Sequence, residues 1–233
     1  MVERRPFGEL PCEDSSWLVS RRHRPLAGQV GRCAGVWTRM QEWSEEEIAP
    51  NAGLPLQARS NVEIVIYVVE GAVTHRDSLG NEGRIEAGSV QVVSAGTGIR
   101  HAEYNLEQTP ARMFQIWFAP ASRGGSPAWA AQPCQPAARF GTFAAIASGF
   151  GRDCDALPIR SGVRVLNVKL RVGETAAHVL GEPRCAYLVP SSGIVDVNGS
   201  LIHARDGAAI ENIDVVTVTA IEDTDVVLVD VSS

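Results

Sequence analysis

His101 and Glu103 are the residues of this sequence whose types and spacing best suit metal chemistry. An imidazole nitrogen and a carboxylate oxygen are both common ligands of divalent transition metals. Successive side chains of a β-strand point to opposite faces, so two residues separated by one position share a face. If this segment is a strand, both side chains can therefore point into the same cavity.

The residues around His101 bear on whether it is a pocket residue or a histidine of the core. A lone buried histidine is usually a satisfied core residue. Here Gly98 precedes His101 and Asn105 follows it, and the glycines Gly96 and Gly98 have neither a following helix nor a nearby lysine. This context indicates a tight turn rather than a phosphate-binding loop. We expect the turn to direct His101 into a pocket.

His75 is a second histidine near this segment, and it lies beside a predicted turn at residues 77–81. Its position favours a structural role, with Asp77 or a backbone group as the hydrogen-bond partner. The alternative is that His75 lines the mouth of the pocket.

The second half of the chain offers no comparable set of ligands. His178, His203 and Asp206 do not have the spacing of a metal site, so this half is predicted to be metal-free. Ser94 and Cys185 have no adjacent base in a recognisable arrangement, which leaves nucleophilic catalysis unsupported.

The elements that must position these residues are predicted to be strands. Short runs rich in Val, Ile, Tyr and Thr recur between clusters of Gly, Asn, Asp and Pro, which is typical of strands joined by turns. The runs are Glu63–Val69, Val90–Val93, Met113–Phe118, Val163–Leu170, Ala186–Val189, Val215–Thr219 and Val226–Val231. The fold class is therefore predicted to be all-β.

Local turn chemistry adds three expectations. Residues 77–81 and the pair Asn198-Gly199 are predicted to be hairpin connections, because Asn and Gly tolerate positive φ. Ser44 followed by three glutamates resembles a helix N-cap with an acidic first turn, so a helical turn is predicted at residues 44–47.

An irregular segment divides the chain into two similar halves. Residues 119–136 are rich in proline and glycine and have no hydrophobic period, which indicates a connector. Each flanking half has the order strand, turn, strand, glycine-containing turn and strand. Two tandem barrels of jelly-roll type fit this repetition.

Charge and cysteine content restrict the possible partners. The formal net charge is −6, so no electrostatic reason exists to bind nucleic acid or an anionic membrane. The five cysteines contain no CxxC pair, and the N-terminal segment has no apolar signal-like stretch. We expect a cytoplasmic protein with free, mostly buried thiols.

The segment Glu63–Asn105 resembles the signature of the pirin family, a group of bicupins that includes bacterial quercetin-dioxygenase-like proteins. The shared motifs are E-I-x3-Y-V-x-E-G, H-x-D-S-L-G-N and A-G-x-V-Q-x2-S-A-G-T-G-I-x-H-x-E-x-N. The resemblance implies two cupin barrels. It predicts an N-terminal barrel at residues 1–120, a linker at 121–136 and a C-terminal barrel at 137–233.

The same resemblance implies a metal, usually iron, held by two histidines of an H-x-H pair, a third histidine and a glutamate. His101 and Glu103 match the last two of these ligands. The first two positions carry Gln57 and Arg59. Glutamine oxygen is a weak ligand, and the guanidinium is a permanently charged donor that cannot bind a cation.

We therefore expect the metal site to be degenerate. Arg59 is predicted to take the place of the metal and to neutralise Glu103 through a charge-assisted hydrogen bond. The alternative is a mixed site in which Arg59 turns outward and Gln57 and Glu63 join His101 and Glu103. We expect no tightly bound cofactor, and a divalent iron, nickel, manganese or zinc ion as the alternative.

Three functions follow from this interpretation. The first is a protein that binds a small aromatic or carboxylate ligand, or another protein, in a pocket of Gln57, Arg59, Glu63, His101 and Glu103. The second is a metal-dependent dioxygenase of the quercetin 2,3-dioxygenase type, with Glu103 as ligand or general base. The third is a transcriptional cofactor acting through protein partners, by analogy with eukaryotic pirins.

Overall fold

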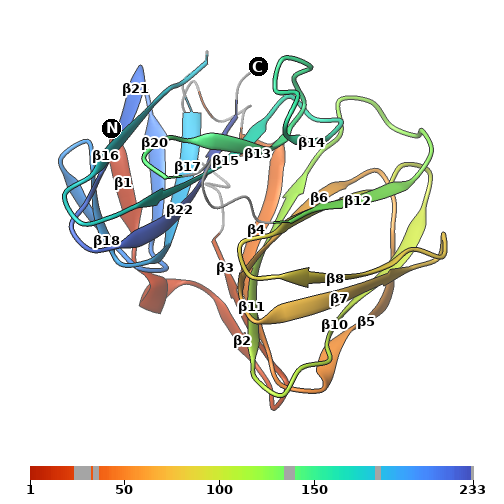
Figure 1. Cartoon of the computed structure of the whole chain (residues 1–233). Coiled ribbons are helices and arrows are strands. Elements are labelled where there is room, and N and C mark those ends of the chain that lie inside the picture. The colour runs from red at the N-terminus through yellow and green to blue at the C-terminus, as the bar shows by residue number, and fades with distance from the viewer. Residues whose placement is uncertain (24–32, 34–36, 134–139, 182–184, 232–233) are drawn as a thin grey trace.

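A computed structural model describes the chain except for residues 24–32, 34–36, 134–139, 182–184 and 232–233 (Figure 1). The described residues form β-strands and short connections, apart from a 3-10 helix at Phe7–Glu9 and the α-helical residue Trp37. No helix among them is both long enough and apolar enough to cross a membrane. The prediction of an all-β fold is confirmed.

The N-terminal barrel pairs a large sheet with a small one. Its strands are β2 (Cys12–Asp14), β3 (Leu18–Arg22), β4 (Met40–Ile48), β5 (Ala52–Arg59), β6 (Glu63–Glu70), β7 (Ala72–Asp77), β8 (Glu82–Glu86), β9 (Val90–Ser94), β10 (Ile99–Asn105), β11 (Ala111–Phe118) and β12 (Ala128–Gln132). The seven-stranded sheet has the order β12-β9-β6-β11-β4-β3-β2, and the four-stranded sheet has the order β5-β10-β7-β8.

The C-terminal barrel repeats this arrangement. Its strands are β1 (Val2–Arg5), β13 (Ala144–Ser148), β14 (Leu157–Pro158), β15 (Arg164–Leu170), β16 (Thr175–Val179), β17 (Cys185–Ser192), β18 (Ile194–Val197), β19 (Ser200–His203), β20 (Gly207–Glu211), β21 (Val215–Ala220) and β22 (Thr224–Asp230). The seven-stranded sheet has the order β1-β20-β17-β22-β15-β13-β14, and the four-stranded sheet has the order β16-β21-β18-β19.

Two strands pair with a barrel outside whose predicted limits they lie. The predicted domain limits themselves, with a linker at residues 121–136, stay a prediction. Strand β1, at the N-terminus, pairs with β20 and so lies in the C-terminal barrel. The segment predicted to be irregular contains β12, which pairs with β9 of the N-terminal barrel. Each unit is therefore completed by a strand from outside its predicted limits (Figure 1).

The predicted helical turn at residues 44–47 is wrong, because these residues lie within β4. Both faces of this central strand carry buried residues, and the buried glutamates Glu45 and Glu46 have polar partners there. Glu46 accepts a hydrogen bond from Gln115, and Glu45 accepts one from Arg205 of the C-terminal barrel. Long-range contacts thus override a local pattern that resembles a helix cap.

A shared hydrophobic core joins the two barrels. One cluster of buried side chains takes residues from both seven-stranded sheets, including Trp43, Phe114, Tyr187 and Val229. Two further clusters fill the interiors of the separate barrels. The large sheets therefore pack against each other, while each small sheet closes its own barrel (Figure 1).

The prediction of free, mostly buried cysteines is wrong for the cysteines that the structure describes. Cys33 and Cys185 form a disulfide with a Cα–Cα distance of 6.1 Å. Cys12 and Cys154 are free but exposed. Cys134 lies outside the described residues.

Candidate metal centre

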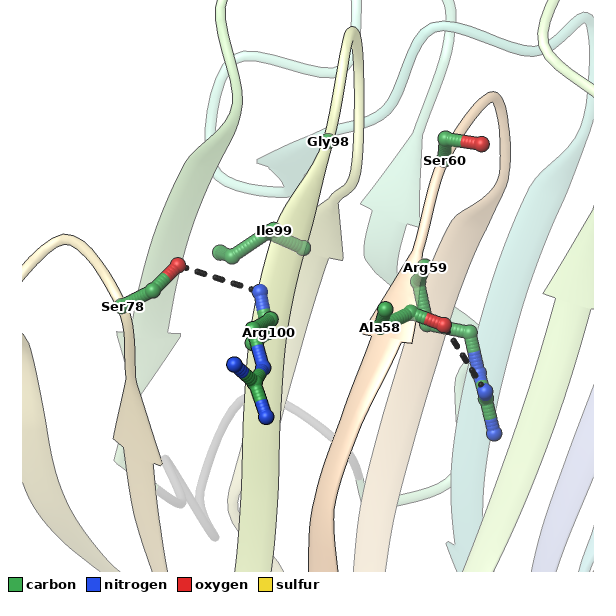
Figure 2. A pocket seen from close by; sticks show the side chains of 7 residues that line it. All are labelled: Ala58, Arg59, Ser60, Ser78, Gly98, Ile99 and Arg100. Carbon is green, nitrogen blue, oxygen red and sulfur yellow. Dashed lines mark hydrogen bonds between the residues drawn. The ribbon is translucent and has the colours of Figure 1, made fainter.

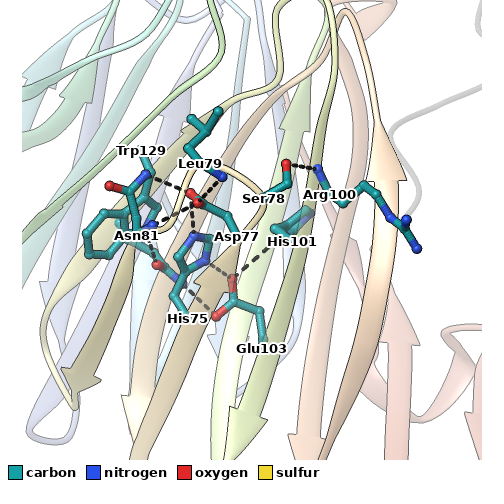
Figure 3. A network of polar contacts seen from close by, with 10 residues as sticks. His75, Asp77, Ser78, Leu79, Asn81, Arg100, His101, Glu103 and Trp129 are labelled. Carbon is teal, nitrogen blue, oxygen red and sulfur yellow. Dashed lines mark hydrogen bonds and ion pairs between the residues drawn. The ribbon is translucent and has the colours of Figure 1, made fainter.

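Three buried side chains form a cluster inside the N-terminal barrel. His75 comes from β7, and His101 and Glu103 come from β10. One potential ligand atom of each lies within 4.8 Å of those of the other two. Figure 3 shows the Glu103 carboxylate facing both imidazoles.

The strand register brings these residues together. On one side, β10 pairs with β7 so that Glu103 lies opposite His75. On the other side, β10 pairs with β5, and His101 lies opposite Gln57. The turn before β10 is tight, because the backbone N–H of Gly98 donates to the carbonyl oxygen of Ala95 over 2.9 Å and Gly96 has a positive φ of 50°. The predicted tight turn and the shared face of His101 and Glu103 are therefore both found.

Hydrogen bonds hold His75 between two carboxylates. Its Nδ1 atom lies 2.8 Å from Oε1 of Glu103, and its Nε2 atom lies 3.2 Å from Oδ2 of Asp77. Its ring also stacks on Trp129, with 4.8 Å between centroids. The predicted Asp77 partner is confirmed. The Glu103 contact was missed because it depends on the pairing of β7 with β10.

The second carboxylate oxygen of Glu103 is also engaged. Gln91 donates from Nε2 to Oε2 of Glu103 over 3.0 Å, and Trp129 donates to Oε1 of Gln91 over 2.7 Å. Trp129 lies on β12, within the segment that the sequence predicted to be irregular. A residue of that segment thus supports the site through both Gln91 and His75.

The ionisation of the cluster follows from these contacts. Burial alone would raise the pKa of Glu103, but the adjacent imidazoles of His101 and His75 outweigh it and hold this pKa below its usual value. Burial disfavours a charged His75, yet the carboxylates of Glu103 and Asp77 raise its pKa overall. Glu103 is therefore an anion, and His75 favours the protonated form that bridges two anions.

The donor set fits a divalent metal in its chemistry. Two imidazoles and one carboxylate are the ligands of many non-haem iron sites. Nδ1 of His101 is buried, has no hydrogen-bond partner among the residues that the structure describes and lies 3.5 Å from Oε1 of Glu103. His101 and Glu103 could therefore accept a cation directly. His75 would first have to release one of its carboxylate partners.

Arg59 does not occupy this position, which corrects the predicted pairing with Glu103. Its guanidinium donates to Oε1 of Gln57 and, over 3.1 Å, to the carbonyl oxygen of Ala58. Its Cζ atom lies 4.7 Å from the centroid of the Trp117 ring. Among the described residues, the contacts of Arg59 are thus with Gln57, Ala58 and Trp117 and not with Glu103, and the amide oxygen of Gln57 accepts one of its hydrogen bonds. Figure 2 shows Arg59 and its hydrogen bond to Ala58.

Comparisons with known proteins agree with this architecture. The family model described as pirin matches residues 34–118, and that of the quercetinase C-terminal cupin domain matches residues 145–231. A pirin-like protein of Caulobacter vibrioides is 49% identical over 230 residues, which are 99% of each chain. The chain belongs to the pirin family. The predicted bicupin fold is confirmed.

Two comparisons with Escherichia coli proteins bear on the site, one with a sequence and one with a solved structure. The quercetin 2,3-dioxygenase of strain K12 is 30% identical over 234 residues, covering 99% of this chain and 98% of the relative. The crystal structure of the bacterial pirin YhhW in complex with nickel(II) has a TM-score of 0.87 and 27% identity. That alignment covers 100% of this chain and 99% of YhhW.

Glu63 does not join the His–Glu cluster, which removes it from the mixed metal site considered above. It lies on the face of β6 that points toward the other barrel. There it accepts hydrogen bonds from Oγ of Ser94 over 2.6 Å and from the backbone N–H of Arg160 over 3.1 Å. Its role in this pirin is therefore to join the two halves of the chain.

Glu46 is a buried acid of the same barrel interior that sequence reasoning missed. It accepts hydrogen bonds from Oγ of Ser44 over 3.2 Å and from Nε2 of Gln115 over 2.8 Å. Burial raises its pKa to about 7, because these neutral donors compensate the charge only partly. The alternation of Ser44, Glu46 and Ile48 within a strand was the available signal.

Proposed function

We propose that the N-terminal barrel of this pirin binds a small aromatic or carboxylate ligand, and binds a divalent cation only weakly through His101 and Glu103. On this proposal the chain is not a competent metal oxygenase. The observation that carries it is the hydrogen bond between Arg59 and Gln57, the residues at the two positions where the resemblance to the family implies histidine ligands.

Two effects of this pair weaken metal binding. Gln57 lies opposite His101 in the β5–β10 register, but its side-chain oxygen already accepts a hydrogen bond from Arg59. The positive guanidinium also opposes a second cation in the same barrel. A cation would have one imidazole ligand, His101, and one carboxylate ligand, Glu103. It would gain a third protein ligand only if His75 released one of its carboxylate partners.

The residues of the site retain useful chemistry without a complete metal shell. Glu103 is an anion fixed by His75 and Gln91, and His101 has a buried nitrogen that can bond a ligand. These groups can orient a phenol or a carboxylic acid and can hold its proton. A divalent ion, when bound, would add Lewis acidity toward a ligand oxygen.

Metal affinity tests the proposal directly. Plasma mass spectrometry of the purified, untagged protein should find less than one metal ion per chain. Titration calorimetry with Ni(II) should show about tenfold or more tighter binding in a variant with both Gln57→His and Arg59→His. His101→Ala is the control that should abolish binding in both backgrounds. A wild type that carries stoichiometric metal as tightly as the double variant would contradict the proposal.

The alternative function is a metal-dependent dioxygenase of the quercetin 2,3-dioxygenase type. It is favoured by the cluster of His75, His101 and Glu103, whose donors match those of non-haem iron oxygenases, and by the name of the Escherichia coli relative. We expect no turnover of quercetin with Fe(II), Mn(II), Ni(II) or Cu(II). Turnover that Glu103→Gln abolishes would establish the dioxygenase instead.

A further inference from the structure

A polar pocket lies where the two barrels meet, on the face of β4 that points away from the His–Glu cluster. Its volume is about 480 Å³, and its lining includes Glu47, Glu70, Thr109, Arg112 and Arg205. Glu46 points into the N-terminal barrel, where it bonds to Gln115, so the next residue, Glu47, lies on the opposite face of the strand. The large sheet therefore separates this pocket from the His–Glu cluster.

Glu47 provides a negative charge that the protein does not neutralise directly. Arg112 lies between Glu47 and Glu70 in the register of β4, β11 and β6. Its guanidinium donates to Glu70, to Oε1 of the buried Glu45 over 3.2 Å and to the carbonyl oxygen of Ser191 over 3.3 Å. Glu47 is partly buried and has no hydrogen-bond or ion-pair partner among the described side chains. Its carboxylate is therefore available to a ligand.

Arg205 provides a positive charge in a fixed position. Its Nε atom donates to Oε1 of Glu45 over 2.6 Å, and its Cζ atom lies 4.0 Å from the centroid of the Phe7 ring. Its φ is 68°, whereas the other described residues with positive φ are glycines and asparagines. This conformation costs an arginine free energy, so the surroundings must hold it. Within the described part of the chain, no residue accepts a hydrogen bond from the Nη groups of Arg205, which leaves these donors for a ligand.

These two charges share the pocket without meeting. Glu47 and Arg205 both line it, yet they form no ion pair with each other. An anion bound to Arg205 would be repelled by Glu47, and a cation bound to Glu47 would be repelled by Arg205. A ligand that carries both charges avoids this repulsion, and each of its charged groups gains a charge-assisted hydrogen bond. The volume of the pocket is in the range that holds small molecules.

We propose that this pocket binds an amino acid in its zwitterionic form, with the carboxylate on Arg205 and the ammonium group on Glu47. A guanidinium matches the planar geometry of a carboxylate, and a carboxylate accepts well from an ammonium group. Glu70 is already paired with Arg112, so Glu47 is the principal anion. This second site goes beyond the function proposed for the interior of the N-terminal barrel and does not depend on it.

Chemical-shift titration of the isotope-labelled, full-length protein by nuclear magnetic resonance tests the proposal. The probes are glycine, β-alanine and 4-aminobutyrate, which differ in the spacing of their two charges. Each is compared, at equal ionic strength, with the amine and the carboxylic acid that lack one of its charged groups. For 4-aminobutyrate these are propylamine and butanoate. At least one of the three zwitterions should bind about tenfold or more tightly than both of its singly charged analogues.

Variants of the two charged residues locate the binding. Glu47→Gln and Arg205→Gln should each weaken the binding of the zwitterion about tenfold or more. Glu47 has no partner among the described residues, so its replacement removes no contact of the fold. Circular dichroism establishes that Arg205→Gln, which loses the bond to Glu45, is folded. The controls Glu82→Gln and Arg100→Gln change exposed charges of the N-terminal barrel outside the pocket and should leave the affinity unchanged.

Three outcomes would overturn the proposal. An amine or an acid that binds as tightly as the matching zwitterion shows a site for a single charge. Binding of the zwitterion that survives Glu47→Gln in full shows that the ligand lies elsewhere. The third outcome is that the wild type binds none of the three zwitterions.

Discussion

Glu46 and Glu103 are two buried carboxyl groups of one barrel whose surroundings shift their pKa values in opposite directions. Glu103 is contacted by two imidazoles, which lower its pKa despite burial. The hydrogen-bond donors to Glu46 among the described residues are neutral, and burial raises its pKa to about 7. When their surroundings move the pKa values of two carboxyl groups apart, the group with the lower pKa is suited to bind positive charge and the group with the higher pKa is suited to hold a proton. Glu103 is therefore the residue suited to a cation.

Replacing Glu46 with Gln should flatten the dependence of stability on pH. Below about pH 4.5 the carboxyl is protonated in the folded and unfolded chain alike. As the pH rises from 4.5 to about 7 the unfolded chain loses this proton while the folded chain keeps it, so the wild type loses stability in this window. The pKa rise from 4.5 to about 7 corresponds to about 3 kcal/mol.

Urea denaturation at several pH values measures this effect. Glu46→Gln should gain up to about 3 kcal/mol relative to the wild type between pH 4.5 and pH 8. Glu82→Gln, at an exposed position of β8, is the matched control and should follow the wild-type profile. Parallel profiles for the wild type and Glu46→Gln would show that Glu46 ionises normally in the folded protein.

Strand β10 is the element on which the site depends, and Asn105 fixes its end. Nδ2 of Asn105 donates to the carbonyl oxygens of Ile48, Ala49 and Thr109 over 2.9, 3.2 and 2.9 Å. Its Oδ1 atom accepts from the backbone N–H of Glu107 over 3.0 Å. One side chain therefore bonds to four backbone groups between the end of β4 and the start of β11, with its two amide N–H groups shared among the three carbonyl oxygens.

Asn105→Ala should destabilise the fold by about 3 kcal/mol, because it leaves buried backbone groups without partners. The midpoint of urea unfolding measures the loss. Leu106→Ala changes the next residue, which is exposed, and should alter stability by less than about 0.5 kcal/mol. Equal effects of the two changes would contradict the role given to Asn105.

The strands with apolar runs could be predicted from the sequence, and those that depend on distant partners could not. Residues 63–69 and 113–118 appear within β6 and β11, because a short, largely apolar run bounded by turn residues favours a strand that is buried on both faces. Strand β4 was missed because its glutamates are matched by Gln115 and by Arg205 of the other barrel. No local pattern records such partners.

The candidate site likewise has features that could be predicted from the sequence and features that could not. The shared face of His101 and Glu103 follows from their spacing, so it could be predicted. The place of His75 depends on the β7–β10 register, and the orientation of Arg59 depends on Trp117 from a different sheet. The spacing of His75 and Asp77, with one residue between them, was a signal that these two side chains share a face. It could not identify Glu103 as the other hydrogen-bond partner of His75.

At the scale of the whole molecule, the two barrels form one packed body. The core between the large sheets takes residues from both barrels, and polar contacts cross the same interface. Tyr67 donates to Oδ2 of Asp225 over 2.7 Å, and Arg205 donates to Glu45 over 2.6 Å. Because neither large sheet can expose its share of the core at low cost, we expect the barrels to unfold together.

The disulfide between Cys33 and Cys185 strengthens this coupling. It joins the segment before β4 to the first residue of β17, with a sequence separation of 152 residues. A cross-link that closes so long a loop restricts the unfolded chain, and the chain-entropy estimate of its stabilisation is about 4–5 kcal/mol. Reductant should therefore lower the urea midpoint of the wild type, within a single transition.

Cys185→Ala should abolish the response to reductant, because the variant cannot form the cross-link. Cys12→Ser removes an exposed free thiol and should respond to reductant as the wild type does. Alkylation of unfolded, unreduced wild type should leave the peptides of Cys33 and Cys185 unmodified. If those two peptides are alkylated and reductant leaves the wild-type midpoint unchanged, the barrels are held together by their shared core and polar contacts alone.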